Sequence, residues 1–584
     1  MLAPGPTGIL LLRTLAHFVL TMIPCFAAAS FIAWRGARDH VILGLTGLAG
    51  IAANGYLAFW LWFLSPPVGH AVSFLLPLFG IAWLLWIGKK LDAPARAAVK
   101  SLALPAALVL CAALLVLSAG FLYGGADKPI ETPWTRFSHR LPPDNMLPFL
   151  FAEEVRIGHI YKPFFEGGHS SDRPPLQAGI ALSQYPFLPR PRESGYTSLG
   201  VILQSLWIFA MWLLLRAFNL DPRIITLALL VTLFSGFTFL NSFFVWPKLL
   251  AAAFMIGFSA MLLVDSCAAE LTRAAPLMIL AGALLAFGLL SHGGSAFALI
   301  GITLAAAALR RHLPLKSIGI VCAAAFVLYL PWLLYQKLFD PPGDALLKLH
   351  LAGIDHPGNG SFLSALAGAY RAISPHIFFQ NKIANARWIF DYENQFFGRL
   401  FDLLSAVCRG RSSEAASAAL DIRSLAFFHF MPNLGFLAAG IVAFAAGIRE
   451  RFRSPVWRVS ARLWLVVICI LIPWCLLMFK PESTSIHQGS YVAVLFAYSA
   501  AILALCSTAR WLAIAIAVLQ IALNFAVYAF PPKPGLVPGE LVTFIAALIA
   551  MLWLLGMRRL PLSALSRRRR NGLGSVNPWR KSRN

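Results

Sequence analysis

Long apolar runs separated by short polar turns make up most of this chain, and their lengths predict its fold. A helix needs roughly 20 apolar residues to cross a hydrocarbon core about 30 Å thick, and about fifteen runs approach that length. We therefore predict an all-α polytopic membrane protein with about 15 transmembrane helices, in a range of roughly 13–16. The runs lie at 9–34, 41–64, 71–88, 101–123, 197–216, 224–243, 249–264, 275–291, 293–309, 317–336, 426–447, 462–479, 491–507, 511–529 and 541–557.

Two long polar segments interrupt this pattern, at 124–197 and at 337–425. We expect both to be extracytoplasmic loops that contain short amphipathic helices. The first concentrates acids, His, Arg and Pro, so we expect it to carry the chemistry. The predicted order of regions is four N-terminal transmembrane helices at 1–123, the first loop at 124–197, a central transmembrane bundle at 198–336, the second loop at 337–425, C-terminal transmembrane helices at 426–557 and a basic tail at 558–584.

Basic residues mark one side of the predicted membrane. Lys and Arg gather in every second short loop, whereas an intervening turn such as 65–70 carries none. Short loops rich in Lys and Arg stay in the cytoplasm. The pattern therefore predicts that the N-terminus lies outside, that the C-terminus is cytoplasmic and that both long loops share the outer face. The first apolar run continues to Trp34, so we expect a retained span and no cleaved signal peptide.

Composition excludes a soluble protein, because 59% of the residues are hydrophobic and only 12% are charged. The net charge of +24 would suggest nucleic acid in a soluble chain. Here the cations lie in the orienting loops and in the tail, so we expect no nucleic-acid partner and contact with anionic lipid headgroups at the tail. No CxxC or HExxH spacing occurs. We expect no disulfide framework, no metal and no cofactor, and leave open a divalent ion on scattered carboxylates.

The first polar segment holds three candidate acids. Asp144 follows two prolines and precedes Pro148, so it either caps the helix that starts there or serves as a base fixed at the membrane surface. Glu153 and Glu154 lie nearly three turns further along and are candidate substrate-binding residues. Neighbouring helical residues point about 100° apart, so only one of the two is expected on the face of Asp144.

Three cationic or titratable residues are candidates for binding an anion. Arg173 precedes two prolines that favour an extended backbone, and its guanidinium suits phosphate oxygens; the alternative is a surface pair with Asp172. Lys248 and His292 lie at the ends of apolar runs, where ionisable residues are costly and often functional. The alternative for Lys248 is that it extends to the membrane interface. His292 is a candidate substrate-binding residue, and its alternative is a hydrogen-bonded core histidine.

The order of these motifs resembles the polytopic glycosyltransferases of the GT-C superfamily, in the branch of protein O-mannosyltransferases and lipid A aminoarabinose transferases. The resemblance covers about 119–353 and includes the loop Asp144, the Arg-Pro-Pro-Leu element at Arg173 and the Pro-Trp pair at Pro331, followed by His350. It implies that Asp144 is the catalytic base, with Arg173 and His350 on the donor phosphate. This chain departs from the family pattern with Arg for Lys at 173 and Leu for Glu at 349, and with four spans before the first loop.

The resemblance implies a membrane glycosyltransferase that moves a sugar from a polyprenyl-phosphate carrier to an acceptor hydroxyl with inversion. The site would face the periplasm in a bacterial inner membrane, and the acceptor would be a glycan, a lipid or a protein. Lys248 would join Arg173 and His350 at the donor phosphate. A lipid-linked donor suits the lack of a Gly-rich phosphate loop in the sequence. Two other functions stay open, namely a transporter or flippase of a lipid-linked or anionic solute, and an O-antigen polymerase or ligase.

Overall fold

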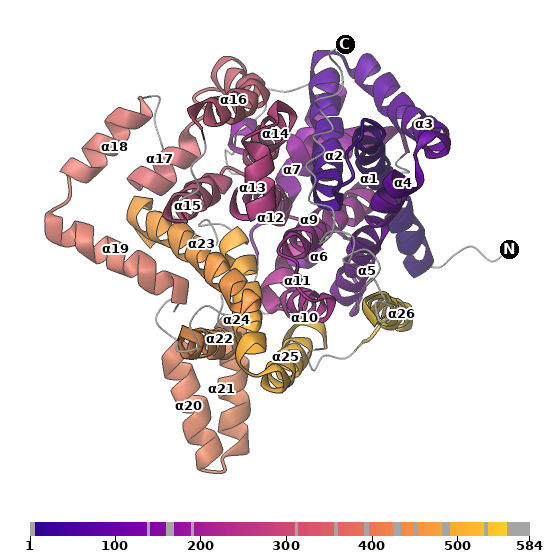
Figure 1. The fold of residues 1–584 in the computed structure, drawn as a ribbon. Coiled ribbons are helices and arrows are strands. Elements are labelled where there is room, and N and C mark those ends of the chain that lie inside the picture. The colour runs from indigo at the N-terminus through magenta and orange to yellow at the C-terminus, as the bar shows by residue number, and fades with distance from the viewer. Residues whose placement is uncertain are drawn as a thin grey trace.

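The computed structural model describes residues 6–136, 141–158, 169–187, 192–309, 314–355, 360–390, 396–425, 434–448, 454–481, 491–530 and 535–556, and the statements below concern these residues. Within them every regular element is helical and no strand occurs, which confirms the all-α prediction (Figure 1). The predicted basic tail at 558–584 lies outside the described residues.

Nine described helical segments are long and apolar enough to cross a membrane. Their length and composition confirm a polytopic membrane protein. The segments are α1 (Pro6–Trp34), α2 (His40–Leu64), α3 (Pro66–Lys90), α4 (Ala93–Lys100) together with α5 (Ala103–Gly120), α9 (Arg192–Ala217), α16 (Leu315–Leu338), α23 (Pro455–Leu477), α24 (Tyr491–Thr508) and α26 (Pro538–Gly556).

Two further apolar runs fold as sharply bent helix pairs. α10 (Pro222–Leu233) meets α11 (Gly236–Phe243) at 63°, and α12 (Lys248–Leu263) meets α13 (Asp265–Leu271) at 82°. Counting each pair as one span gives up to 11 spans. The bend before α11 is fixed from both sides, because Ser235 caps α11 through Thr238 N while Gly236 N donates to the Asn524 side chain.

Four other apolar runs form shorter helices, so the predicted count of about 15 spans is not established. The described part of each predicted run does overlap a helix or a bent pair, but hydropathy measures apolar content and not the unbroken length of a helix. The two predicted runs on either side of His292, for example, form helices of only 17 and 14 residues. The four are α14 (Ala275–Ser291), α15 (Ser295–Ala308), α22 (Leu434–Ile448) and α25 (Arg510–Asn524).

The centre of the bundle is α9, which is buried from Ser194 to Leu215. It packs against α5 and α12 (Figure 1), and α12 is itself buried along its whole length. The first polar segment contributes to this interior. It forms α6 (Thr132–Thr135), η1 (Pro143–Met146), α7 (Leu147–Ile157), η3 (Ser170–Asp172), α8 (Leu176–Gln184) and η4 (Tyr185–Phe187).

Helix α8 is fully buried although it belongs to the predicted outer loop. It packs on α2 through two glycines, because the position of a Cβ on Gly179 would lie only 2.3 Å from the Gly55 carbonyl oxygen. The second polar segment instead extends to the periphery (Figure 1). Its helices are α17 (Ala345–Ala352), α18 (Phe362–Arg371), α19 (Pro375–Phe390), α20 (Phe396–Cys408) and α21 (Ser412–Leu425).

The contact between α2 and α8 generates a stability prediction. Gly179→Ala places a methyl group against backbone that has no room for it, so we expect the melting temperature in detergent to fall by several degrees. Gly319→Ala in α16 is the matched control, because no atom lies within 4 Å of the position that its methyl group would take and Ala favours a helix. Equal melting temperatures for the two variants would contradict the close packing of α2 on α8.

Candidate functional site

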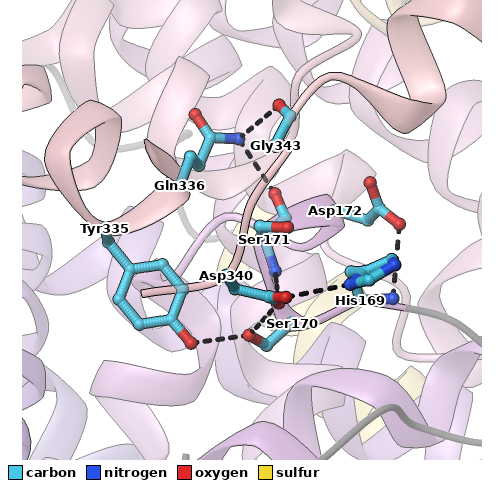
Figure 2. A network of polar contacts seen from close by, with 8 residues as sticks. All are labelled: His169, Ser170, Ser171, Asp172, Tyr335, Gln336, Asp340 and Gly343. Atoms are coloured by element: carbon cyan, nitrogen blue, oxygen red, sulfur yellow. Dashed lines mark hydrogen bonds and ion pairs between the residues drawn. The ribbon is translucent and has the colours of Figure 1, made fainter. Parts of the chain in front are cut away.

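The two polar segments meet in a network of hydrogen bonds between η3 and the end of α16 (Figure 2). The carboxylate of Asp340 accepts from Ser170 Oγ at 2.6 Å, from Ser171 N at 2.9 Å and from His169 Nδ1 at 2.9 Å. Tyr335 OH lies 2.5 Å from Ser170 Oγ. These contacts fasten the turn immediately before Arg173 to the chain that follows α16.

A second set of contacts completes the fastening. Gln336 Nε2 donates to the carbonyl oxygens of Ser171 at 2.9 Å and of Gly343 at 3.3 Å, so it bridges the two segments (Figure 2). Burial opposes ionisation of Asp340, but the donations from Ser170, Ser171 N and His169 outweigh it and hold the pKa of Asp340 below its ordinary value. Asp340 is therefore an anion that stabilises the turn.

Arg173 leaves this fastened turn and reaches Asp144. Its Nη2 lies 3.4 Å from Asp144 Oδ2, longer than a tight charge-assisted bond, and its Nε is buried without a hydrogen-bond partner. The ion-pair partner of Arg173 is thus Asp144 and not the adjacent Asp172. Burial raises the pKa of Asp172, although the positive charge of Arg173 acts to lower it. The guanidinium keeps capacity to bind a further acceptor.

Asp144 does not cap a helix, so that interpretation of the sequence was wrong. It lies in the 3-10 turn η1, and α7 begins after Met146 without a side-chain cap. Pro148 does occupy the first turn of α7, as predicted. The carboxylate of Asp144 is partly exposed at 26% and is oriented toward Arg173.

Lys248 is the first residue of α12 and is only 4% exposed, so burial in the protein gives no support to the alternative that it extends to the membrane interface. Its Nζ has no hydrogen-bond partner and lies 3.6 Å from the centroid of the Trp246 ring and 5.3 Å from that of Tyr491. These ring faces provide partial compensation for an ammonium ion. The charges of Asp144 and Arg173 both act on it, so the three groups share one neighbourhood.

His292 and His350 belong to the same neighbourhood. His292 ends α14, and its Nδ1 accepts from Gly294 N at 3.0 Å. The charges of Lys248, Arg173 and His350 all act on the His292 ring. His350 is held by α17 and by the hydrogen bond from Phe479 N to its carbonyl oxygen at 3.0 Å. Five predicted residues from four distant parts of the chain thus each lie within electrostatic reach of at least one other, and Asp144 is the one carboxylate among them.

Glu153 is engaged elsewhere in the described contacts, whereas no described side-chain contact engages Glu154. Glu153 Oε2 pairs with Arg156 at 2.7 Å and with Arg192 at 3.1 Å, which ties α7 to the start of α9. Glu154 has one buried carboxylate oxygen without a hydrogen-bond partner. We therefore assign Glu153 a structural contact, and its candidacy for substrate binding gains no support from this geometry.

A cavity of about 730 Å³ adjoins the same outer segment. Its wall includes Met146, two residues after Asp144, and the apolar side chains of Phe149 and Leu150. Charged residues from three elements complete the lining. They are Arg13, Asp127, Lys128, Glu131 and Glu193.

The comparisons with known proteins identify no relative: no protein-family model, no curated protein and no solved structure matches this chain. The function must therefore be argued from the site. In the described part of the chain no group of three His, Cys, Asp or Glu side chains is placed to hold a metal ion. The expectation of no metal and no cofactor stays a prediction.

Sequence reasoning missed two parts of this site. One is Asp340 with Tyr335, which the sequence places at the end of a span before two prolines. The other is a pair of glutamines, Gln177 and Gln204, buried at 1% and 0% within apolar segments. A buried amide in an apolar run is costly unless it is hydrogen-bonded, and that cost was the available signal.

The fastening of η3 by Asp340 generates a pH prediction. The pKa of Asp340 is lower in the folded protein than in the unfolded chain. The contribution of Asp340 to stability is therefore complete above about pH 4, and it is lost as the pH falls through the folded-state pKa. The melting temperature of Asp340→Asn should thus lie furthest below wild type near neutral pH, and the gap should narrow below about pH 4. Asp402→Asn, at an exposed pair with Arg399, is the control and should show little difference at any pH. A gap that widens on acidification would contradict the assignment.

Proposed function

We propose that this protein is a glycosyltransferase that moves a sugar from a polyprenyl-phosphate carrier to an acceptor hydroxyl. The proposal places the site on the periplasmic face of a bacterial inner membrane. The observation that carries it is the position of Asp144, which contacts Arg173 at 3.4 Å and acts electrostatically on the buried, unpaired Lys248. One carboxylate and a group of cations near the ends of apolar helices suit a base and an anionic leaving group.

In the proposed reaction the carboxylate of Asp144 takes the proton of the acceptor hydroxyl. The acceptor oxygen forms a bond to the anomeric carbon from the face opposite the carrier. The bond between that carbon and the phosphate oxygen breaks, and its electron pair leaves with the phosphate, which gives inversion. Arg173 and Lys248 stabilise the charge that grows on the phosphate, with His350 and His292 nearby.

Burial makes these cations effective. Lys248 has only 4% of its surface exposed, and two aromatic rings replace part of its hydration. Fixed charges in such a water-poor site interact more strongly with a developing anion than charges in water do, an effect of several kcal/mol. A lipid carrier can bring its phosphate to this depth because its polyprenyl chain stays in the bilayer.

The cavity of about 730 Å³ is the proposed room for the acceptor. Its carboxylates, among them Asp127 and Glu131, suit the hydroxyl groups of a sugar or of a lipid headgroup, and Phe149 provides an apolar wall. The acceptor hydroxyl would approach Asp144 from the side of Met146. A glycan or a lipid acceptor fits this lining.

A transporter or flippase of a lipid-linked or anionic solute is the second candidate. The two bent helix pairs favour it, because transporters commonly bind their substrates at broken helices. Lys248 at the start of α12 would then bind a solute and no bond would break. An O-antigen polymerase or ligase remains a third candidate that would not need Asp144. Radiolabelled sugar transfer from a synthetic polyprenyl-phosphate donor separates chemistry from transport.

Asp144→Asn tests the base. The amide keeps the shape of the side chain but cannot take a proton, so we expect transfer to fall by about 100- to 10,000-fold with an unchanged melting temperature. The control is Asp92→Asn, which also alters an Asp paired with an Arg, at 2.7 Å from Arg38. Wild-type turnover by Asp144→Asn would remove Asp144 from the mechanism.

Lys248→Met separates function from stability. The thioether chain fills a similar volume without an uncompensated charge, so the melting temperature should be equal or higher. Transfer should fall by roughly 100-fold because the leaving phosphate loses a cation. A variant that is more stable and equally active would show that Lys248 does not contact the donor.

A further inference from the structure

Three buried side chains and one backbone carbonyl group form one continuous hydrogen-bonded chain through the bundle. Gln204 Nε2 donates to Gln177 Oε1 at 2.9 Å, and Gln177 Nε2 donates to Tyr196 OH at 2.9 Å. Tyr196 OH donates to the carbonyl oxygen of Asn145 at 3.1 Å. All four residues are at most 1% exposed.

One end of this hydrogen-bonded chain lies next to Lys248, and the other end lies next to Asp144. At one end Gln204 Oε1 accepts from Leu249 N and Leu250 N, both at 3.1 Å, and these are the residues directly after Lys248. At the other end Asn145 directly follows Asp144. The chain therefore connects the residue next to the base with the residues next to the buried cation.

The Asn145 end is anchored by the side chain as well as by the carbonyl group. Its Nδ2 donates to the carbonyl oxygen of Ile130 at 2.8 Å, and its Oδ1 accepts from Trp134 Nε1 at 2.7 Å. A buried amide with its donor and acceptor both engaged has little freedom to move. The η1 turn that carries Asp144 is thereby fixed to the preceding loop and to α9.

The links all run in one direction, from the amides of α12 to the Asn145 carbonyl oxygen. Hydrogen bonds aligned in this way polarise one another and strengthen the whole row. Gln177 Nε2 also donates to the Val245 carbonyl oxygen at 2.9 Å, just before α12. The chain therefore holds the turn before α12 as well as the first turn of that helix.

The same contacts decide which groups of α12 are available to an anion. The amides of Leu249 and Leu250 are taken by Gln204, and Lys248 N and Ala251 N donate to the carbonyl oxygens of Trp246 and Pro247. The start of α12 thus presents no unoccupied amide from its first turn. The ammonium group of Lys248 is the group that remains for a phosphate.

An unpaired ammonium and a nearby carboxylate attract each other strongly in a water-poor interior. Direct pairing of Lys248 with Asp144 would occupy both groups and close the space between them. In the structure Lys248 Nζ has no hydrogen-bond partner although the charge of Asp144 acts on it. Some contact must hold the η1 turn with Asp144 apart from the start of α12. The buried hydrogen-bonded chain contacts both of these segments.

We propose that Gln204, Gln177 and Tyr196, acting through the Asn145 carbonyl, are positioning residues that fix the separation between the base Asp144 and the cation Lys248. This inference rests on the proposed function, since the separation is the space in which the sugar phosphate would lie. The two halves of the chain hold different reactants: the Tyr196 half holds the base, and the Gln204 half holds the cation that meets the donor.

Two single variants test this division of labour with a polyprenyl-phosphate-sugar donor. Tyr196→Phe breaks the link to Asn145 but leaves Gln204 on α12, so kcat should fall about 10- to 100-fold while KM for the donor changes by less than about 2-fold. Gln204→Met releases the first turn of α12, so KM for the donor should rise about 10-fold. Ser205→Ala is the matched control, because the hydroxyl bonds only to Val201 O in its own helix, and its kinetics should equal those of wild type.

A structural role alone would lower the yield or the melting temperature without this split. Wild-type kcat and KM per folded molecule in both variants, or the same change in both, would overturn the proposal. If the wild-type protein transfers no sugar, the proposed function fails. The hydrogen-bonded chain is then tested by the melting temperatures of the variants. Hydrogen bonds of one chain should be coupled, so the melting temperature of the double variant Tyr196→Phe/Gln204→Met should fall by less than the sum of the two single decreases. Additive decreases would refute the hydrogen-bonded chain.

Discussion

The burial of the Lys248 amino group is the constraint on which the rest of the site depends. An ammonium group with 4% exposure and no hydrogen-bond partner is costly, and the rings of Trp246 and Tyr491 offset only part of that cost. Such an arrangement persists only where the surrounding structure holds it in place. The bundle does so with α12, which is buried along its whole length and begins at this residue.

Two separate sets of hydrogen bonds hold Arg173 and Asp144, the two residues whose charges act on Lys248. The network around Asp340 fastens the turn before Arg173 to the end of α16 (Figure 2), and the row from Gln204 to Asn145 fastens the turn that carries Asp144. The two sets share no residue. Arg173 and Asp144 therefore meet at 3.4 Å because independent parts of the fold bring them there, and not because they pair tightly.

The bent helices explain how charged groups enter an apolar bundle. A continuous span would carry the residue before it to the membrane surface, whereas the bend before α11 and the turn between α11 and α12, where Lys248 lies, are both buried in the protein. Polar backbone at these breaks is satisfied by Asn524, Gln177 and Gln204. Non-helical backbone at such depth is tolerated when it is buried in protein in this way.

The sequence by itself determined the class of the protein and singled out the ionisable residues that make up the candidate site. Apolar runs predicted helices because a backbone in lipid must satisfy its own hydrogen bonds, and costly residues such as Asp144, Arg173 and Lys248 were visible against that background. Only the tertiary structure decided which of them meet. Glu153 lies in the same polar segment as Asp144 yet pairs with Arg192, while Asp340 reaches His169 across 171 positions. Hydropathy is a local property of the chain, whereas the partner of a buried charge depends on contacts between elements far apart in it.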